Sequence, residues 1–125
     1  VNSSHSSARK TILLVDDDPP VRNYLHLALQ YLGFTVESCE DVTSALRQFE
    51  ANRPALILTD CNLPAHSGVE LIRAIRSNHH EIPLIGMSGE HFKGREMLNA
   101  GATAFLPKPV EMATLQETLK ETVKE

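Results

Sequence analysis

The chain has 125 residues, 42% of them hydrophobic, and a formal net charge of -4 at pH 7. This length and apolar content suffice for one globular domain with a core of its own, and they are too small for two domains. The acidic balance, without any cluster of lysine or arginine, argues against direct nucleic-acid binding. No apolar run is long enough to span a bilayer or to act as a signal peptide, so we expect a cytoplasmic protein without a membrane contact.

Residues 1–9 are rich in serine, and the chain begins at Val1, where a native start would show methionine. This composition is typical of a flexible tail or linker, which leaves 10–125 as the folded domain. Both a fragment of a longer protein and an engineered start fit this beginning. The two cysteines, Cys39 and Cys61, form no CxxC motif, and we expect reduced thiols.

The first two apolar segments, 11–15 and 35–39, are predicted to be strands. Between them, from about Pro20, apolar residues recur at three- and four-residue spacing, which is typical of an amphipathic helix. Gly33 is expected to end this helix as a left-handed cap. Asp41 can cap a second amphipathic helix.

The third apolar segment, 55–59, predicts a strand that leads directly into Asp60. Ser67, with Glu70 three residues later, forms a capping-box pattern. This pattern predicts a third helix that begins at Ser67 and ends near Ser77.

A fourth strand is predicted at 83–87 and a fifth at 103–106. The segment between them, 90–100, is predicted to be a helix that Gly101 ends and that Gly94 weakens by roughly 1 kcal/mol relative to alanine. After Pro107-Lys108-Pro109, a last helix carries its apolar positions at Met112, Leu115, Leu119 and Val123. Strands and helices thus alternate five times, which predicts an α/β fold with a parallel sheet covered by helices on both faces.

Polar residues follow four of the five predicted strands: Asp16-Asp17-Asp18, Asp60, Ser88 and Lys108. Because the carboxyl ends of parallel strands lie at one edge of a sheet, we expect these residues to meet there. Converging carboxylates repel one another unless a hard divalent cation lies among them, which predicts a Mg2+ site. A carboxylate beside Mg2+, with a hydroxyl group and a lysine nearby, is equipped to accept a phosphoryl group.

Each of these residues also has an ordinary structural interpretation. An acidic run before two prolines is a common helix start, and Asp18 is the best candidate for a pure cap. Asp60 alone fits a solvated turn residue, and Ser88 alone fits a tight turn. Lys108 is harder to explain in this way, because its two flanking prolines fix the direction of its ammonium group.

In this order, the residues resemble the receiver domain of two-component response regulators. The resemblance covers nearly the whole chain from Lys10 onward, and the motifs that carry it are ILLVDDDP, LILTDCNLP with the following Gly68, MSG and AGATAFLPKP. It implies a flavodoxin-like (βα)5 fold, with a doubly wound five-stranded parallel sheet in the strand order 2-1-3-4-5. It also implies a signalling domain that accepts a phosphoryl group and is not an enzyme.

The resemblance assigns a role to each site residue. By this likeness, Mg2+ is held by Asp16, Asp17, Asp60 and the backbone carbonyl of Asn62. Asp60 matches the residue that accepts a phosphoryl group from a phosphohistidine of a histidine kinase or histidine phosphotransfer protein. Ser88 and Lys108 match the residues that assist the transfer, and Ser88 and Phe105 match the switch. The family usually has a cis peptide bond before the proline that matches Pro109.

The chain departs from the family's usual pattern at three positions. Ser67 stands where an acid is common, and Gly89 stands where a small alanine is usual. Phe105 lacks the hydroxyl group of the commoner tyrosine, so switching at this position must rely on packing. Asn62 and Glu90 match the pair in the chemotaxis receiver that loses its phosphate rapidly, and we therefore expect a short-lived phosphorylated state.

By the same resemblance, phosphorylation shifts a pre-existing equilibrium, and an effector binds the face built from the helix at 90–100, the strand at 103–106 and the last helix. A phosphorylation-linked dimer is compatible with this. The main alternative is a pseudo-receiver, which keeps the interaction face without using phosphate, and the complete set of site residues argues against it. A phosphatase with an aspartyl nucleophile would usually carry a second acid at the position of Asn62, and a P-loop ATPase would need a GxxxxGK[ST] motif that this sequence lacks.

Overall fold

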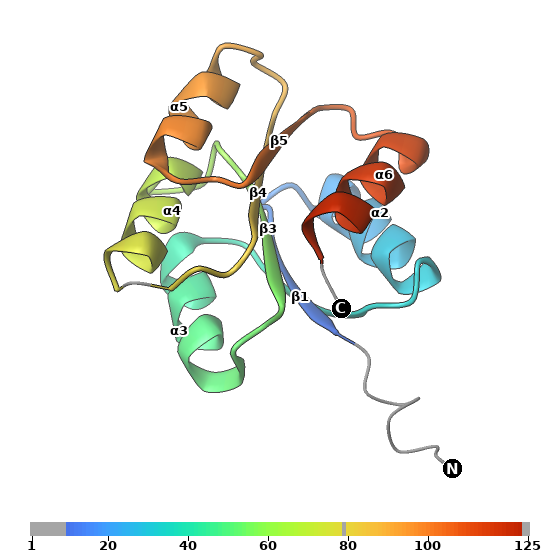
Figure 1. Ribbon diagram of the computed structural model, residues 1–125, viewed down its shortest axis with the longest axis horizontal. Helices are drawn as coiled ribbons and strands as arrows, with labels where there is room; N and C mark the ends of the chain where they lie inside the picture. The colour runs from blue at the N-terminus through green and yellow to red at the C-terminus, as the bar shows by residue number, and fades with distance from the viewer. Residues whose placement is uncertain (1–9, 79, 124–125) are drawn as a thin grey trace.

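The computed structural model describes residues 10–78 and 80–123, which form strands and helices in strict alternation (Figure 1). In chain order these are β1 (Thr11–Val15), α2 (Pro19–Tyr31), β2 (Thr35–Cys39), α3 (Val42–Asn52), β3 (Leu56–Asp60), α4 (Gly68–Ser77), β4 (Leu84–Ser88), α5 (Lys93–Ala100), β5 (Ala104–Pro107) and α6 (Met112–Thr122). The flexible tail expected at 1–9 lies outside the described residues. No helix in the described part of the chain is both long enough and apolar enough to cross a membrane.

The five strands form one parallel sheet in the order β2-β1-β3-β4-β5, which confirms the expected flavodoxin-like topology. Helices α2 and α6 cover one face of the sheet, and α3, α4 and α5 cover the other (Figure 1). Because the chain winds in opposite directions from the middle of the sheet, the carboxyl ends of β1 and β3 flank a crevice between neighbouring loops.

The sequence of the central strands follows from their position between two helical layers. All residues of β3 and β4 are buried, as are the last four residues of β1. A strand that is covered on both faces needs apolar side chains on both, so these strands do not alternate, and the polar residues of β3 and β4 stand at their carboxyl ends. The edge strands β2 and β5 are only partly buried.

Two helix caps confirm the turn chemistry expected from the sequence. The Asp41 side chain accepts a hydrogen bond from the Ser44 N–H at 2.8 Å, and Ser67 and Glu70 form a reciprocal capping box at the start of α4. Gly33 and Gly101 follow α2 and α5 with φ angles of 104° and 122°, as expected for helix-ending residues.

Several boundaries differ from the expected ones. β3, β4 and β5 each begin and end one residue later, because pairing with the neighbouring strand extends to Asp60 and Ser88. α5 begins at Lys93 instead of Glu90, since a turn precedes it in which the Lys93 N–H donates to the Glu90 carbonyl. Asp18 occupies the N-cap position of α2, as expected, but its side chain makes no cap hydrogen bond.

Candidate functional site

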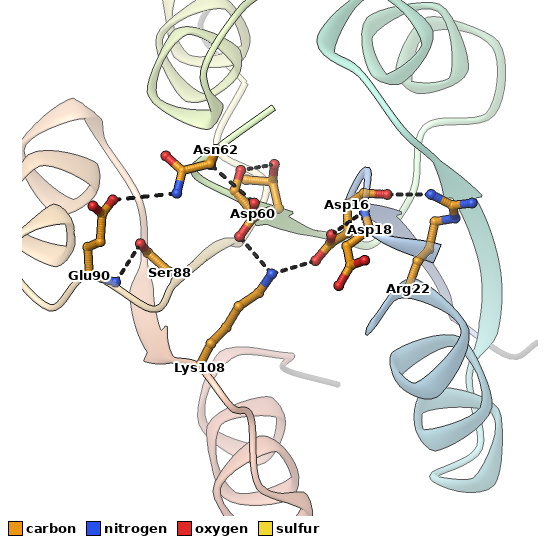
Figure 2. A network of polar contacts seen from close by, with 9 residues as sticks. Asp16, Asp18, Arg22, Asp60, Asn62, Ser88, Glu90 and Lys108 are labelled. Atoms are coloured by element: carbon orange, nitrogen blue, oxygen red, sulfur yellow. Dashed lines mark hydrogen bonds and ion pairs between the residues drawn. The ribbon is translucent and has the colours of Figure 1, made fainter. Parts of the chain in front are cut away.

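The loops after β1, β3, β4 and β5 bring distant polar side chains together at one edge of the sheet (Figure 2). Asp60 and Ser88 are the last residues of β3 and β4, while Asp16 and Lys108 directly follow β1 and β5. Asp16 and Ser88 are fully buried, and Asp60 is 5% exposed. Buried polar groups are costly without partners, so their burial here requires the contacts that follow.

Three carboxylates form the centre of the site. Asp16, Asp17 and Asp60 each place one oxygen within 4.8 Å of the others, with Asp17 exposed at the rim. Carboxylate oxygens are the donors that hard divalent cations prefer. This group could therefore hold a divalent metal ion, and Asp17 leaves it open to solvent.

Lys108 holds two of these carboxylates. Its Nζ donates to Asp16 Oδ2 at 2.8 Å and lies 2.9 Å from Asp60 Oδ1. Burial alone would lower the pKa of Lys108, but the hydrogen bonds and negative charges of Asp16 and Asp60 outweigh burial and raise it. Burial raises the pKa of Asp60 above its usual range, although Lys108 opposes the effect. The peptide bond between Lys108 and Pro109 is cis, as the sequence led us to expect.

Backbone groups position the Asp60 side chain from the loop that follows β3. The Asn62 N–H donates to Asp60 Oδ2 at 3.1 Å, and the Gly68 N–H donates to the Cys61 carbonyl at 2.8 Å. A Cβ atom at position 68 would collide with the Asp60 carbonyl oxygen. The loop can therefore close over the end of β3 only because residue 68 has no side chain.

Ser88 and the pair Asn62–Glu90 lie on the other side of Asp60 (Figure 2). Ser88 Oγ accepts a hydrogen bond from the Glu90 N–H at 3.0 Å, which fixes the oxygen and leaves its O–H as a donor. The Asn62 side-chain amide donates to Glu90 Oε1 at 3.4 Å, and both side chains are exposed. These two residues thus form a weak bridge at the solvent edge of the site.

Arg22 is a site residue that sequence reasoning missed. Its Nη1 donates to the Asp16 backbone carbonyl at 2.7 Å, which holds the peptide that carries the acidic pair (Figure 2). A helix that starts at Pro19 places residue 22 about one turn from its beginning, but nothing in the sequence marks the Asp16 carbonyl as its partner.

Phe105 lies apart from the acidic group. It is a partly buried residue of β5 that packs with the core between the sheet and helices α3, α4 and α5. Its ring lies so close to Gly94 of α5 that a Cβ atom at position 94 would collide with it. The structure therefore brings Asp16, Asp17 and Asp60 into one cluster and places Phe105 between the sheet and α5.

The protein is a doubly wound α/β domain. It carries an acidic group, a lysine and a hydroxyl group at the carboxyl edge of its parallel sheet. The family model of the response regulator receiver domain matches residues 12–120. The chain therefore belongs to the response regulator receiver domain family.

Individual relatives agree with this assignment. Response regulator MprA of Mycobacterium ulcerans is 34% identical over 106 residues, which cover 83% of this chain and 46% of that protein. The chain thus spans about half the length of the curated relatives that it matches.

Solved structures show the same fold. The receiver domain of sensor histidine kinase PA1611 from Pseudomonas aeruginosa, solved with a magnesium ion coordinated in the active site cleft, is 35% identical with a TM-score of 0.86 over 93% of this chain and 98% of that one. Chemotaxis protein CheY4 of Vibrio cholerae is 32% identical with a TM-score of 0.85, over 92% of this chain and 99% of that chain.

Proposed function

We propose that this chain is a phosphoacceptor in a two-component phosphorelay, and that Asp60 takes a phosphoryl group from a phosphohistidine of a histidine kinase or histidine phosphotransfer protein. The observation that carries the proposal is the position of Asp60 at the end of β3, where it shares the Lys108 ammonium with Asp16 and lies in one cluster with the Asp16 and Asp17 carboxylates. The proposed domain modifies its own side chain and is not an enzyme that acts on a separate substrate.

In the proposed transfer, a P–O bond to Asp60 forms while the P–N bond to the donor imidazole breaks, and the imidazole leaves with the electron pair of that bond. Asp16, Asp17, Asp60 and the Asn62 carbonyl would hold the Mg2+ ion. When bound, Mg2+ supplies positive charge that offsets the oxygens of the acceptor and of the phosphoryl group. Lys108 pairs with a phosphoryl oxygen, and the Ser88 hydroxyl donates to another.

The response is proposed to reach a partner through the surface of α5, β5 and α6. Ser88 and Phe105 lie on adjacent strands that lead from the acceptor site to this surface. Phe92 and Leu98 are 72% and 47% exposed on the same side, which leaves apolar area for a downstream effector protein or a phosphorylation-linked second copy. A cytoplasmic location and the absence of direct nucleic-acid contact stay predictions.

The proposal is tested by phosphoryl uptake in Asp60→Asn. We expect purified wild-type protein with Mg2+ to take up label from acetyl phosphate and from a phosphorylated kinase, and the variant to take up none, because an amide is not a nucleophile.

The matched control is Asp41→Asn, which changes the same side chain at a helix cap where asparagine also caps well. It should be labelled like the wild type. Label in Asp60→Asn would contradict the assignment of the acceptor, and an unlabelled wild type would favour the pseudo-receiver.

The bridge between Asn62 and Glu90 leads to a prediction about lifetime. We expect the phosphorylated state to be short-lived, and we expect Asn62→Lys to prolong it several-fold. A lysine at position 62 would pair with the Glu90 carboxylate more strongly than the amide does at 3.4 Å, and we expect this ion pair to hinder the approach of water to phosphorylated Asp60. The measurement is the loss of label after the donor is removed.

Asn52→Lys is the control, because the Asn52 amide also contacts a carboxylate, that of Glu37 at 3.2 Å, on a helix away from the site. It should leave the lifetime unchanged. Equal lifetimes in all three proteins would show that the side chain at 62 does not control water access.

A further inference from the structure

Gly94, the second residue of α5, is buried beneath the ring of Phe105. A Cβ atom at position 94 would lie 2.8 Å from Phe105 Cδ2, 3.0 Å from Cε2 and 3.1 Å from Cγ. These distances are too short for carbon atoms, and a planar ring cannot bend to relieve them. A side chain at 94 and the ring in its present position therefore exclude each other.

This contact differs from those of other glycines in the neighbourhood. A Cβ at Gly89 would meet nothing within 4 Å, and a Cβ at Gly86 would meet the flexible side chain of Met97. At Gly94 the neighbour is a rigid ring that comes from another element, β5. Glycine is also a poor helix former, so residue 94 weakens α5 while it makes room for the ring.

We propose that Gly94 is a positioning residue for Phe105: its missing side chain forms a seat that holds the ring against α5, and any larger residue drives the ring off this seat. This inference rests on the proposed function and on the interpretation of Ser88 and Phe105 as the switch that responds to phosphorylation of Asp60. The seat adjoins a surface groove lined by Phe92, Leu98 and Phe105 itself, so occupation of the seat determines the shape of the proposed effector surface.

The position of Phe105 in the sheet connects the seat to the acceptor site. Phe105 pairs with Gly86 in β4, two residues before Ser88, and it precedes Lys108 by three residues in the chain. If phosphorylation draws the ring off the seat, a variant that destabilises only the seated ring should bind a phosphoryl mimic more tightly, because the two equilibria are linked.

The seat itself is tested by a double-mutant cycle of thermal midpoints. Gly94→Ala should lower the midpoint by roughly 4 °C in the wild-type background, because the methyl group displaces the ring. In the Phe105→Ala background the same change should leave the midpoint equal or higher, since alanine favours the helix and no ring remains. Gly89→Ala, which adds a methyl group into open space, should not depend on Phe105. Equal effects of Gly94→Ala in both backgrounds would overturn the seat.

The link to the acceptor site is tested by calorimetric titration with beryllofluoride in the presence of Mg2+. Gly94→Ala should bind it several-fold more tightly than the wild type, whereas Gly94→Ala in the Phe105→Ala background should match Phe105→Ala alone. A merely structural role of Gly94 would not move this affinity.

The midpoint cycle and the beryllofluoride titration give different results when this inference fails and when the proposed function fails. A wild type that binds beryllofluoride, with an affinity that Gly94→Ala leaves unchanged, would overturn the link while the acceptor assignment stands. A wild type that binds no beryllofluoride would overturn the acceptor assignment and with it the link, and the midpoint cycle would still decide whether Gly94 seats the ring.

Discussion

Lys108→Met is expected to destabilise the metal-free domain by about 3 to 5 kcal/mol, the range for breaking a buried ion pair by removing one partner. Lys108 is the cation that Asp16 and Asp60 share at 2.8 and 2.9 Å, and Asp16 is fully buried. Without the ammonium, two close carboxylates face each other with no compensating charge. The free energy of unfolding in urea, measured in the presence of EDTA, checks this loss.

Millimolar Mg2+ should restore most of the lost stability in Lys108→Met, because a ligand that binds only the folded state adds to its stability. It should also bind the variant more tightly than the wild type, since Lys108 no longer occupies the carboxylates. Lys120→Met is the control: this lysine is exposed on α6, and its replacement should change neither quantity. A Lys108→Met variant as stable as the wild type in EDTA would show that desolvation cancels the attraction in these ion pairs.

Most of the fold could be predicted from the sequence because its local hydrophobic and capping patterns match the burial and the helix ends of the folded chain. The strands at 11–15 and 35–39 have the expected bounds, and Asp41 and Ser67 cap the helices that their patterns indicate. The later strands shift by one residue because their ends are determined by pairing with a neighbour, as in Asp60 with Met87. Such pairing joins residues far apart in the chain, so no local window contains it.

The site was predictable as a set, since parallel strands deliver their carboxyl ends to one edge. Its supporting contacts were not. Arg22 donates to a backbone carbonyl, which carries no sequence signal. Residue 68 must be glycine because a Cβ atom there would collide with the Asp60 carbonyl oxygen. Gly94 was interpreted from helix propensity alone, whereas the structure gives it a steric reason in the ring of Phe105. These three residues share one property: their partner is known only when the chain is folded.

Asp60→Asn is also expected to stabilise the metal-free domain at neutral pH. Burial raises the pKa of Asp60 in the folded state, so the ionised carboxylate that neutral pH requires is disfavoured there. The amide removes this cost, and Lys108 keeps its hydrogen bond to Asp16. The Asp60 carboxyl group thus favours folding only in its protonated form, at low pH, and this contribution is lost as the pH rises through its raised pKa.

The stability gain from Asp60→Asn should therefore shrink as the pH is lowered through the pKa of folded Asp60 and be smallest below the unfolded value, which is about 3.9. Urea unfolding in EDTA at a series of pH values measures it. Asp41→Asn supplies the opposite sign, because the Ser44 backbone hydrogen bond lowers the pKa of Asp41, so this variant should lose stability at neutral pH and recover towards acid. An Asp60→Asn stability gain that does not vary with pH would mean that burial does not disfavour the ionised Asp60 carboxylate. The reactivity of Asp60 would then have to come from bound Mg2+ and Lys108.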